Sequence, residues 1–241
     1  MKPLSPRGHH HVEEHRDVQG GAARAAVFGV SDGLVSNVSL ILGVAGAGPS
    51  GATVRLAGLA GLIAGAVSMA AGEFISMQAQ RELLERELAA ERRALADDYS
   101  TEVQELAEIY RRRGLKPETA REVADQLMAD PDVALEIHAR EELGVDPAAL
   151  GSPFGAAGSS FVAFCAGAVV PLVPWFLAAG AAAVLSSVIL GLLTALAVGG
   201  ILAGFTGRSM LWSALRQALI AAFASAVTFA VGALVGQAGL S

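Results

Sequence analysis

The side chains best suited to binding a metal cation fall into two groups along this 241-residue chain. The first group lies in otherwise apolar stretches and comprises Asp32, Met69 and Glu73. The second lies in a charged segment and comprises Glu91, Glu102, Glu105, His138 and Glu142. Carboxylate, imidazole and thioether groups in these combinations favour a transition metal such as Fe(II), Mn(II) or Zn(II).

Asp32 stands inside a stretch, Phe28–Val44, that is apolar enough to form most of a membrane span. A carboxylate near the centre of a bilayer costs about 2.5–3.5 kcal/mol on insertion scales, so such an acid usually faces a water-filled path or a bound cation. Further oxygens follow on Ser31, Ser36, Asn37 and Ser39. We therefore expect Asp32 to line a cation path; the alternative is that it lies at the membrane surface and only caps a helix.

Met69 and Glu73 lie four residues apart in the next apolar stretch and so share one face of a helix. A methionine by itself usually fills a core, but beside two intramembrane acids its soft sulfur can serve as a metal ligand. Gly61 and Gly65 form a G-x-x-x-G pair in the same stretch, which predicts close contact with another helix.

Pairs of possible metal ligands recur at helical spacing in the charged segment, so that the two members of each pair share a helix face. The pairs are Glu87 with Glu91, Glu102 with Glu105, and His138 with Glu142. Three helices could thus bring carboxylates and one imidazole together as a polynuclear divalent-cation site. The alternative is that each glutamate is solvated and pairs with a nearby arginine at modest gain.

The composition places these residues in a membrane protein. Charged residues make up 17% of the chain, against about 25% in a typical soluble domain. The apolar runs predict an all-α, polytopic protein with five transmembrane helices, near residues 26–47, 56–78, 158–179, 182–206 and 215–237. The net charge of −6 leaves no basic face for nucleic acid, and the single cysteine, Cys165, leaves no disulfide framework.

The segment between the second and third spans is expected to form a cytoplasmic helical metal-binding domain. Residues 81–150 carry 18 acidic and 10 basic residues, whereas the spans are nearly uncharged. The second span should continue into this domain as one long helix, because neither glycine nor proline interrupts residues 73–113. A break is expected near residues 97–98, where Thr101 and Gln104 resemble a capping box.

The predicted organisation therefore has four parts. They are a tail (1–24) containing His9, His10, His11 and His15, transmembrane helices 1 and 2 (25–80), the acidic domain (81–150) and transmembrane helices 3 to 5 (151–241). Short histidine tracts can bind transition metals; the alternative is a solvated, disordered tail.

The distribution of basic residues predicts the orientation of the spans. A cytoplasmic N-terminus puts the acidic domain, the four basic residues of the tail and the link between Arg208 and Arg216 inside, and leaves only Arg55 outside. The C-terminus is then outside. No targeting segment is visible, and the alanine- and arginine-rich composition favours a bacterial plasma membrane. Small-residue pairs such as Gly61/Gly65, Gly200/Gly204 and Gly232/Gly236 provide faces on which a homodimer could form.

Three segments resemble the vacuolar iron transporter (VIT) family. They are D-G-L-V-S-N-V-S-L-I-L-G-V from residue 32, S-M-A-A-G-E-F-I-S from residue 68, and the acidic domain ending in E-E-L-G. The resemblance covers residues 24–237. It implies a dimeric, five-helix carrier that moves Fe(II), and often Mn(II), out of the cytosol in exchange for protons, with a metal-binding domain built on the extension of the second span.

The resemblance also implies roles for individual residues. Asp32 and Met69 match the acid and the methionine of the family's translocation path, and Glu73 belongs to one form of its second motif. The family's domain glutamates match Glu91, Glu102, Glu105 and Glu142. Ala94 stands where a further glutamate can occur, and His138-Ala139 replaces a methionine pair of plant relatives.

We therefore expect a metal/proton antiporter that needs no prosthetic group and whose partners are membrane lipid, divalent cations and protons. A membrane sensor or store that binds metal without transporting it is the first alternative. A ferroxidase-like di-iron enzyme is the second, and it is disfavoured because such sites use paired Glu-x-x-His motifs, whereas the only histidine of the acidic domain, His138, follows Leu135 at that spacing.

Overall fold

The computed structural model describes residues 21–142, 144 and 151–239, with only the backbone at 21–24 and 132. Its secondary structure is helical throughout the described chain, and five of these helices are long and apolar enough to cross a membrane. The predicted all-α, five-span class is therefore confirmed. The histidines of the predicted tail lie outside the described residues.

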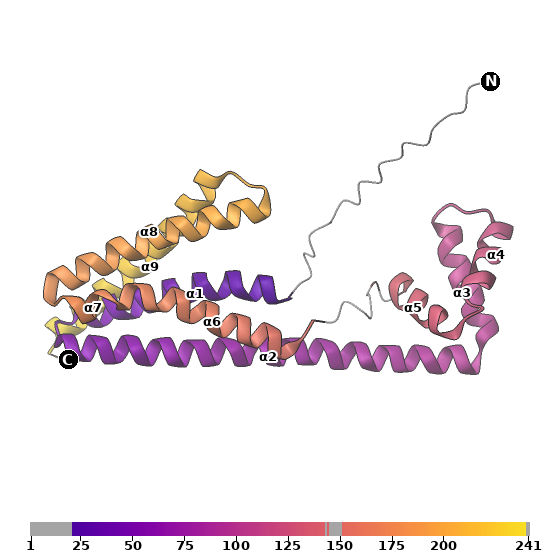
Figure 1. Ribbon diagram of the computed structural model, residues 1–241, viewed down its shortest axis with the longest axis horizontal. Helices are drawn as coiled ribbons and strands as arrows, with labels where there is room; N and C mark the ends of the chain where they lie inside the picture. Colours follow the sequence, from indigo (N-terminus) through magenta and orange to yellow (C-terminus); the bar gives the residue numbers. More distant parts are fainter. Residues whose placement is uncertain (1–20, 143, 145–150, 240–241) are drawn as a thin grey trace, which may run out of the picture.

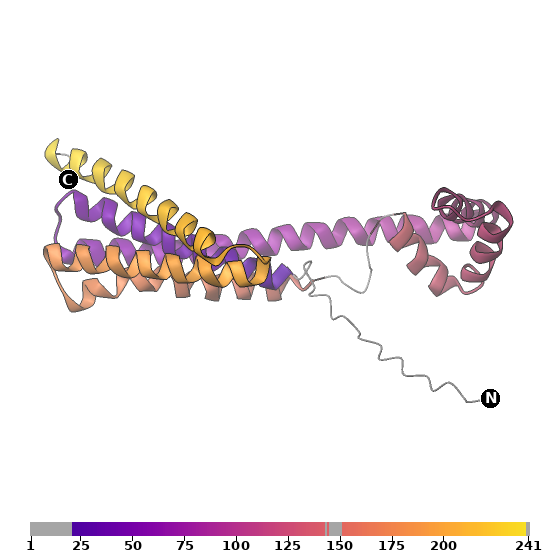
Figure 2. The same ribbon diagram turned by 90° about the horizontal axis from the view of Figure 1, so that it is seen from above.

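Four of the five long helices lie in a bundle side by side, and the fifth extends far beyond it (Figures 1 and 2). The spanning helices are α1 (Gly21–Gly46), α2 (Gly51–Asp97), α6 (Pro153–Leu172), α8 (Gly180–Thr206) and α9 (Met210–Gln237). Helix α1 lies at the centre, because it contacts each of the other four. Buried Leu34 and Ile41 of α1 pack into two separate apolar clusters at different levels of the bundle.

Glycines allow α1 and α6 to approach until their backbones touch. A Cβ on Gly33 would collide with the backbone carbonyl of Phe164, and a Cβ on Gly167 would collide with that of Val30. Small residues are what helix pairs in lipid use for close packing, since lipid supplies no hydrophobic force between them. The α1–α6 pair is consequently the most tightly joined part of the bundle.

Helix α2 has 47 residues, which corresponds to about 70 Å at 1.5 Å per residue. It crosses the bundle with its first half and carries the inserted domain on its second half (Figure 1). That domain consists of α3 (Tyr99–Arg112), α4 (Pro117–Leu127) and α5 (Pro131–Glu141) packed around buried residues Val103, Leu106, Ala124, Met128 and Ala134.

The break between α2 and α3 falls at Asp98, as predicted, but the capping residue differs. The Asp98 side chain accepts a hydrogen bond from the backbone N–H of Thr101 and another from its hydroxyl. The predicted capping box from Thr101 to Gln104 is therefore wrong, because Thr101 already lies in the first turn of α3. An aspartate is as good an N-cap as a threonine.

Two span boundaries also differ from those predicted. The third span ends at Leu172, and a separate short helix, α7 (Pro174–Leu177), follows, because Pro174 has no N–H with which to continue the ladder. Ser187 of α8 donates a hydrogen bond to the carbonyl of Pro171 at this corner. The fifth span begins at Met210 behind the Ser209 cap, so Arg216 lies inside α9 and not at the end of the link.

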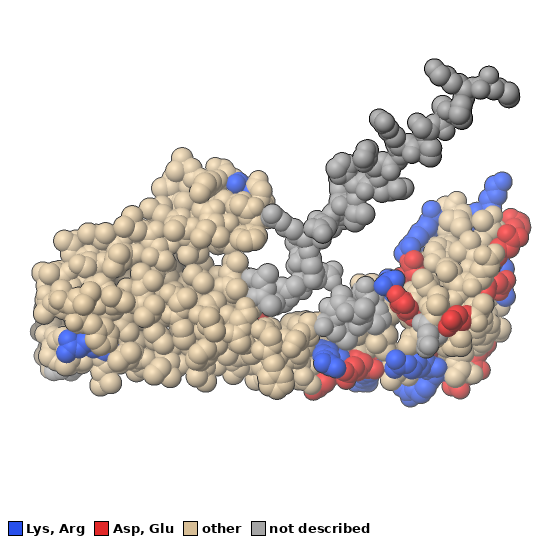
Figure 3. Space-filling model, viewed as in Figure 1, with Lys and Arg blue, Asp and Glu red and all other residues tan. Residues whose placement is uncertain are grey.

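Charge separates the two halves of the molecule. On the face shown in Figure 3, acidic and basic side chains gather on the inserted domain and the adjoining part of α2, whereas the bundle shows only a few basic ones. The bundle surface carries many exposed large apolar side chains, among them Ile63, Leu185 and Phe223. Such a surface suits lipid and not water.

Two of the three glycine pairs expected to serve a dimer pack against neighbours inside one chain. A Cβ on Gly61 or Gly65 would meet Leu40 or Phe164, and one on Gly232 or Gly236 would meet the α1 backbone at Gly43 or Ala47. Gly200 faces Met210, and no described atom lies within 4 Å of a Cβ on Gly204. Gly61/Gly65 and Gly232/Gly236 therefore pack within the subunit and give no support to a dimer, whereas Gly204 makes no close contact within the described chain.

We predict that Gly167→Ala destabilises the protein, because the added methyl meets backbone that cannot rotate away. Overpacking of this kind costs about 1–3 kcal/mol. The matched control is Gly158→Ala on the same helix, where no described atom lies within 4 Å of the new Cβ; it should keep or slightly raise the melting temperature. Thermal unfolding in detergent measures both, and equal melting temperatures would contradict the tight packing of α1 and α6.

Candidate metal sites

A cavity of about 270 Å³ lies between α1, α2 and α6 at the level of the apolar spans. Its lining consists of Asp32, Ser36, Asn37, Leu40, Gly61, Gly65, Ser68, Met69 and Phe164. The structure thus brings Asp32 and Met69, predicted from different spans, into one cavity. A carboxylate, a thioether and several neutral oxygens can together bind a borderline-soft divalent cation.

The cavity opens on one flank of the bundle. Asp32, Ser36 and Ser68 are exposed to the outside of a single chain there, and Leu40 is 39% exposed. A carboxylate on the outer surface of a membrane-spanning bundle would face hydrocarbon, which is costly unless something polar covers it. The position of Asp32 well inside α1 also argues against the alternative that it only caps a helix.

Glycine and one aromatic ring shape the cavity wall. Gly61 and Gly65 leave α2 without side chains opposite α1, and the Phe164 ring of α6 occupies the space beside Gly65. The sequence analysis missed Phe164, because an isolated phenylalanine in an apolar span carries no signal that separates it from ordinary core.

Glu73 is not among the residues that line this cavity. It lies one turn beyond Met69 on α2, toward the inserted domain, and is half-buried. The structure therefore places Glu73 between the cavity and the domain and not beside Asp32.

The second group converges on His138 in the inserted domain. Nδ1 of His138 lies 2.9 Å from a carboxylate oxygen of Glu91 and 3.7 Å from one each of Glu102 and Glu142. The imidazole is fully buried. Three segments supply these groups: the extension of α2, the first turn of α3, and the end of α5 with the residue that follows it. We call Glu91, Glu102, His138 and Glu142 the domain cluster.

The other acids of the domain lie further out. Glu105 is exposed, yet it is close enough to raise the pKa values of Glu91 and Glu102 through its charge. Glu87 is exposed on the outer face of α2. The predicted Glu102/Glu105 pair thus borders the cluster, whereas only one member of the Glu87/Glu91 pair belongs to it.

Burial and mutual repulsion perturb the acids of the cluster. Burial raises the pKa of Glu91 above its usual range, and the charges of Glu142 and Glu105 raise it further, whereas His138 opposes the shift. The pKa of Glu102 is raised chiefly by burial and then by the charges of Glu91 and Glu105. Such a set holds protons more firmly than solvated carboxylates do, unless another cation neutralises it.

The geometry of the cluster fits a bound cation. Nδ1 of His138 and Oε1 of Glu91 pair with each other at 2.9 Å, but Nε2 of His138, which is also buried, has no hydrogen-bond partner among the described residues. Neighbouring ligands of an octahedral ion with bonds of about 2.1 Å lie about 3.0 Å apart, close to the 2.9 Å between Nδ1 of His138 and Glu91. Oxygen and nitrogen atoms of Glu91, His138 and Glu142 all lie within 4.8 Å of one another.

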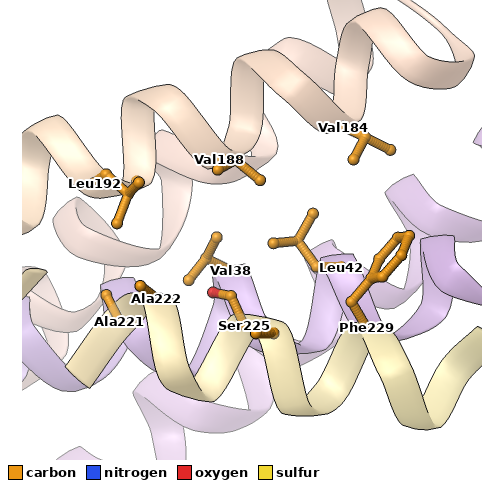
Figure 4. A pocket seen from close by; sticks show the side chains of 11 residues that line it. Val38, Leu42, Val184, Val188, Leu192, Ala221, Ala222, Ser225 and Phe229 are labelled. Atoms are coloured by element: carbon orange, nitrogen blue, oxygen red, sulfur yellow. The ribbon is translucent and has the colours of Figure 1, made fainter. Parts of the chain in front are cut away.

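A second cavity in the bundle, of about 310 Å³, has a different character. It lies between α1, α8 and α9 and is lined by aliphatic side chains such as Val38, Val188 and Leu192, with Ser225 as a polar exception (Figure 4). Its lining has no ionisable group, and the Ser225 hydroxyl is the one side-chain oxygen among its lining residues that could replace a water of a divalent cation. Of these two cavities, the one between α1, α2 and α6 therefore offers the better candidate ligands.

Comparisons with known proteins agree with this arrangement. A model of the VIT family matches residues 23–233. The vacuolar iron transporter of Acanthamoeba castellanii is 38% identical over 231 residues, which cover 92% of this chain and 82% of that protein. Vacuolar iron transporter 1 of Arabidopsis thaliana is 35% identical over 94% of this chain and 90% of its own. Vacuolar iron transporter 1 of Oryza sativa is 33% identical over 97% and 93%, respectively.

These names are those of transporters and not of enzymes, and the matches extend over both the bundle and the inserted domain. The chain belongs to the VIT family.

Proposed function

We propose that the protein exports Fe(II), and also Mn(II), from the cytosol in exchange for protons. The observation that carries this proposal is the cavity that joins Asp32 to Met69 at membrane depth, in a chain whose relatives are named vacuolar iron transporters. Carboxylate and thioether ligands suit these ions, and an ionisable residue in a span usually marks an ion path.

In this mechanism the inserted domain is cytoplasmic and collects the metal. The ion is bound at the domain cluster, passes Glu73 along α2 and reaches Asp32 and Met69. Each carboxylate must lose its proton to bind the metal and regains one when the metal leaves. Metal and protons therefore compete for the same groups, which is the physical basis of exchange. The division into tail, spans 1–2, acidic domain and spans 3–5 is part of this proposal.

The open flank of the cavity favours a homodimer. Asp32, Ser36 and Ser68 are exposed on one chain, and a second copy related by a two-fold axis would cover the same groups with its own. Most soluble homo-oligomers use such symmetric pairs, and in lipid the advantage is greater because hydrocarbon cannot solvate a carboxylate. The cation path would then run between the first two spans of each subunit.

The orientation follows from the basic residues. Arg208 precedes α9 at the end of the bundle nearer the inserted domain, whereas Arg55 is at the opposite end, where it donates to the carbonyl of Trp175. With the domain in the cytosol, Arg55 is the outer charge and the C-terminus is outside. The names of the relatives refer to the vacuole; for this chain we propose a bacterial plasma membrane, across which export would lower cytosolic metal.

We predict that Asp32→Ala abolishes metal flux. Purified protein in proteoliposomes with an internal pH dye should take up Fe(II) and Mn(II) while protons leave, with Zn(II) and Ca(II) as comparison ions. The variant should lose at least about tenfold in rate, since even outer-shell partners of a metal are worth 10–100-fold. Glu122→Gln, an exposed acid on α4, is the matched control. Flux through Asp32→Ala would refute the path, and no flux through wild type with metal still bound would indicate a sensor or store.

We predict that metal binding at the domain cluster weakens with acid. The pKa values of Glu91 and Glu102 lie above the usual 4.5, so these groups are protonated nearer neutrality and the metal must displace their protons. Without metal the native domain holds more protons than the unfolded chain, and its stability falls as the pH rises from about 4.5 through the raised pKa values. With metal bound, the stability of the domain should instead rise with pH, because fewer protons then compete with the metal for the carboxylates. Mn(II) binding followed by electron paramagnetic resonance between pH 5.5 and 7.5 checks this.

The same titration tests the ligands one by one. Glu91→Gln and His138→Ala should each weaken Mn(II) binding at pH 7.5 by at least about tenfold, whereas Glu122→Gln should not. Equal affinity in all of these proteins, or affinity that does not change with pH, would show that the cluster is only a buried ion-pair network.

We predict that the exposed flank is a subunit interface. In a Cys165→Ser background, Ser68→Cys should be joined into dimers by bismaleimide reagents in native membranes. Leu219→Cys, which is 66% exposed on α9, should face lipid and remain monomeric on the same gel. A chain that stays uncrosslinked at position 68 with every reagent length, and that scatters light as a monomer in detergent, would disprove the dimer.

A further inference from the structure

Asn37 lies near the middle of the span Ala25–Gly46 and is only 2% exposed. Its side chain lines the cavity that also contains Asp32 and Met69. Burying an amide in an apolar span costs free energy unless both of its polar ends are satisfied. How the two ends of this amide are used is therefore informative.

One end of the amide is fixed by α6. Nδ2 of Asn37 donates a hydrogen bond to the backbone carbonyl of Ala168, at 2.7 Å. A carbonyl can only accept, so the nitrogen and not the oxygen must face Ala168. This bond settles the orientation of the amide, which could otherwise be turned end for end.

The other end is directed toward α2. Oδ1 of Asn37 would lie 3.1 Å from a Cβ on Gly61, and both residues line the cavity. Oδ1 is buried and has no hydrogen-bond partner among the described residues. Leaving such an acceptor unpaired costs about 1–3 kcal/mol. A role limited to joining α1 to α6 would use only the N–H of the amide and would not explain why the oxygen is buried without a partner.

We propose that Oδ1 of Asn37 is a ligand for the cation in the cavity, placed beyond Asp32 on the side away from the inserted domain. This inference rests on the proposed function and extends it by one residue. The α1 chain rises about 1.5 Å per residue, so the five residues from Asp32 to Asn37 carry the ion roughly 7–8 Å further across the membrane. The cavity of about 270 Å³ has room for the ion and several waters, each of which takes about 30 Å³ in the liquid.

A neutral carbonyl at this point has a clear chemical use. It can replace a water of the cation, as carbonyl oxygens do in ion-selective filters, but it carries no charge that would hold the ion back. It also adds an amide oxygen to a cavity that contains the carboxylate of Asp32, the hydroxyls of Ser36 and Ser68 and the soft sulfur of Met69. Asn37 is thus expected to affect which divalent cation the cavity accepts.

The test compares Asn37→Leu with Asn37→Asp. Both substitutions remove the amide N–H that bonds to Ala168, but only the aspartate keeps an oxygen directed at the cavity. If Asn37 is a ligand, Asn37→Leu should raise KM for Mn(II) at least about tenfold and change the ratio of Mn(II) to Zn(II) transport. Asn37→Asp should keep transport with an equal or lower KM. The matched control is Ser160→Ala. It also removes a buried polar group that has no described partner, the Ser160 hydroxyl, but Ser160 does not line the cavity.

A structural role gives the opposite pattern. Because both variants lose the bond to Ala168, they would then lose melting temperature and maximal rate together while KM and the metal ratio stay as in wild type. That result, or a wild-type KM in Asn37→Leu, would overturn the inference.

Direct binding separates this inference from the transport proposal. In a background of Glu91→Gln with His138→Ala, which silences the domain cluster, Mn(II) bound by detergent-solubilised protein should fall with Asn37→Leu and persist with Asn37→Asp. If wild type moves no metal but shows this binding pattern, the export proposal fails and the Asn37 ligand stands. If wild type transports metal and Asn37→Leu binds Mn(II) as well as the background protein does, only the ligand assignment fails.

Discussion

Hydrocarbon offers no hydrogen bonds and no solvation for charge, and this constraint bears most strongly on the ionisable and amide side chains of the bundle. Asp32, Ser36 and Ser68 gather on a single flank beside one cavity instead of being spread over the lipid-facing surface. Asn37 is buried and divides its amide between α6 and that cavity. The opposite side of α1 meets an apolar cavity. Asp32, Ser36, Asn37 and Ser68 thus lie together on one side of α1, beside the cavity through which we propose that the cation passes.

The packing of the helices gives this route two different walls. Glycines join α1 to α6 through backbone contacts, which neither helix can relieve by turning a side chain. Against α2, in contrast, the contacts at Gly61 and Gly65 are made by the side chains of Leu40 and Phe164. Close packing transmits strain through backbone more rigidly than through rotatable side chains. The wall formed by α1 and α6 therefore fixes Asp32 and Asn37, whereas the α2 wall, with Met69, is held more softly.

The sequence predicted the helices well because their signals are local. Long apolar runs, the uninterrupted stretch from α2 into the domain, and the prolines that begin α4 and α5 each act within a few residues. Errors arose where the outcome depended on a partner distant in the chain. Gly61/Gly65 and Gly232/Gly236 predicted close packing correctly, but the spacing cannot say whether the neighbour belongs to the same chain. Likewise, Asp98 and Thr101 are both good caps, and tertiary packing chose the aspartate.

In the candidate sites, too, local spacing was predicted correctly and contacts between distant segments were not. Helical spacing placed Glu91, Glu102, His138 and Glu142 on compatible faces, and the structure brings them around one imidazole. Spacing could not separate Glu87 from Glu91, because which of two acids points inward depends on where α3 and α5 pack. The position of Phe164 and the direction of the Asn37 oxygen could not be predicted for a related reason. Both depend on which residues they face across the bundle, and no local sequence pattern indicates that.

The two candidate sites also differ in the number and charge of the ligands that they offer a cation. The domain cluster offers three carboxylates and an imidazole, all close together and partly withdrawn from water. The cavity offers one carboxylate, one thioether and neutral oxygens. A path conducts only if each site binds well enough to receive the ion and weakly enough to release it. Along the proposed path, ligand charge decreases from the cluster through Glu73 on α2 to Asp32 and the neutral amide of Asn37 on α1. In the export we propose, protons returning to the vacated carboxylates would offset the tighter binding at the cluster and favour release of the metal.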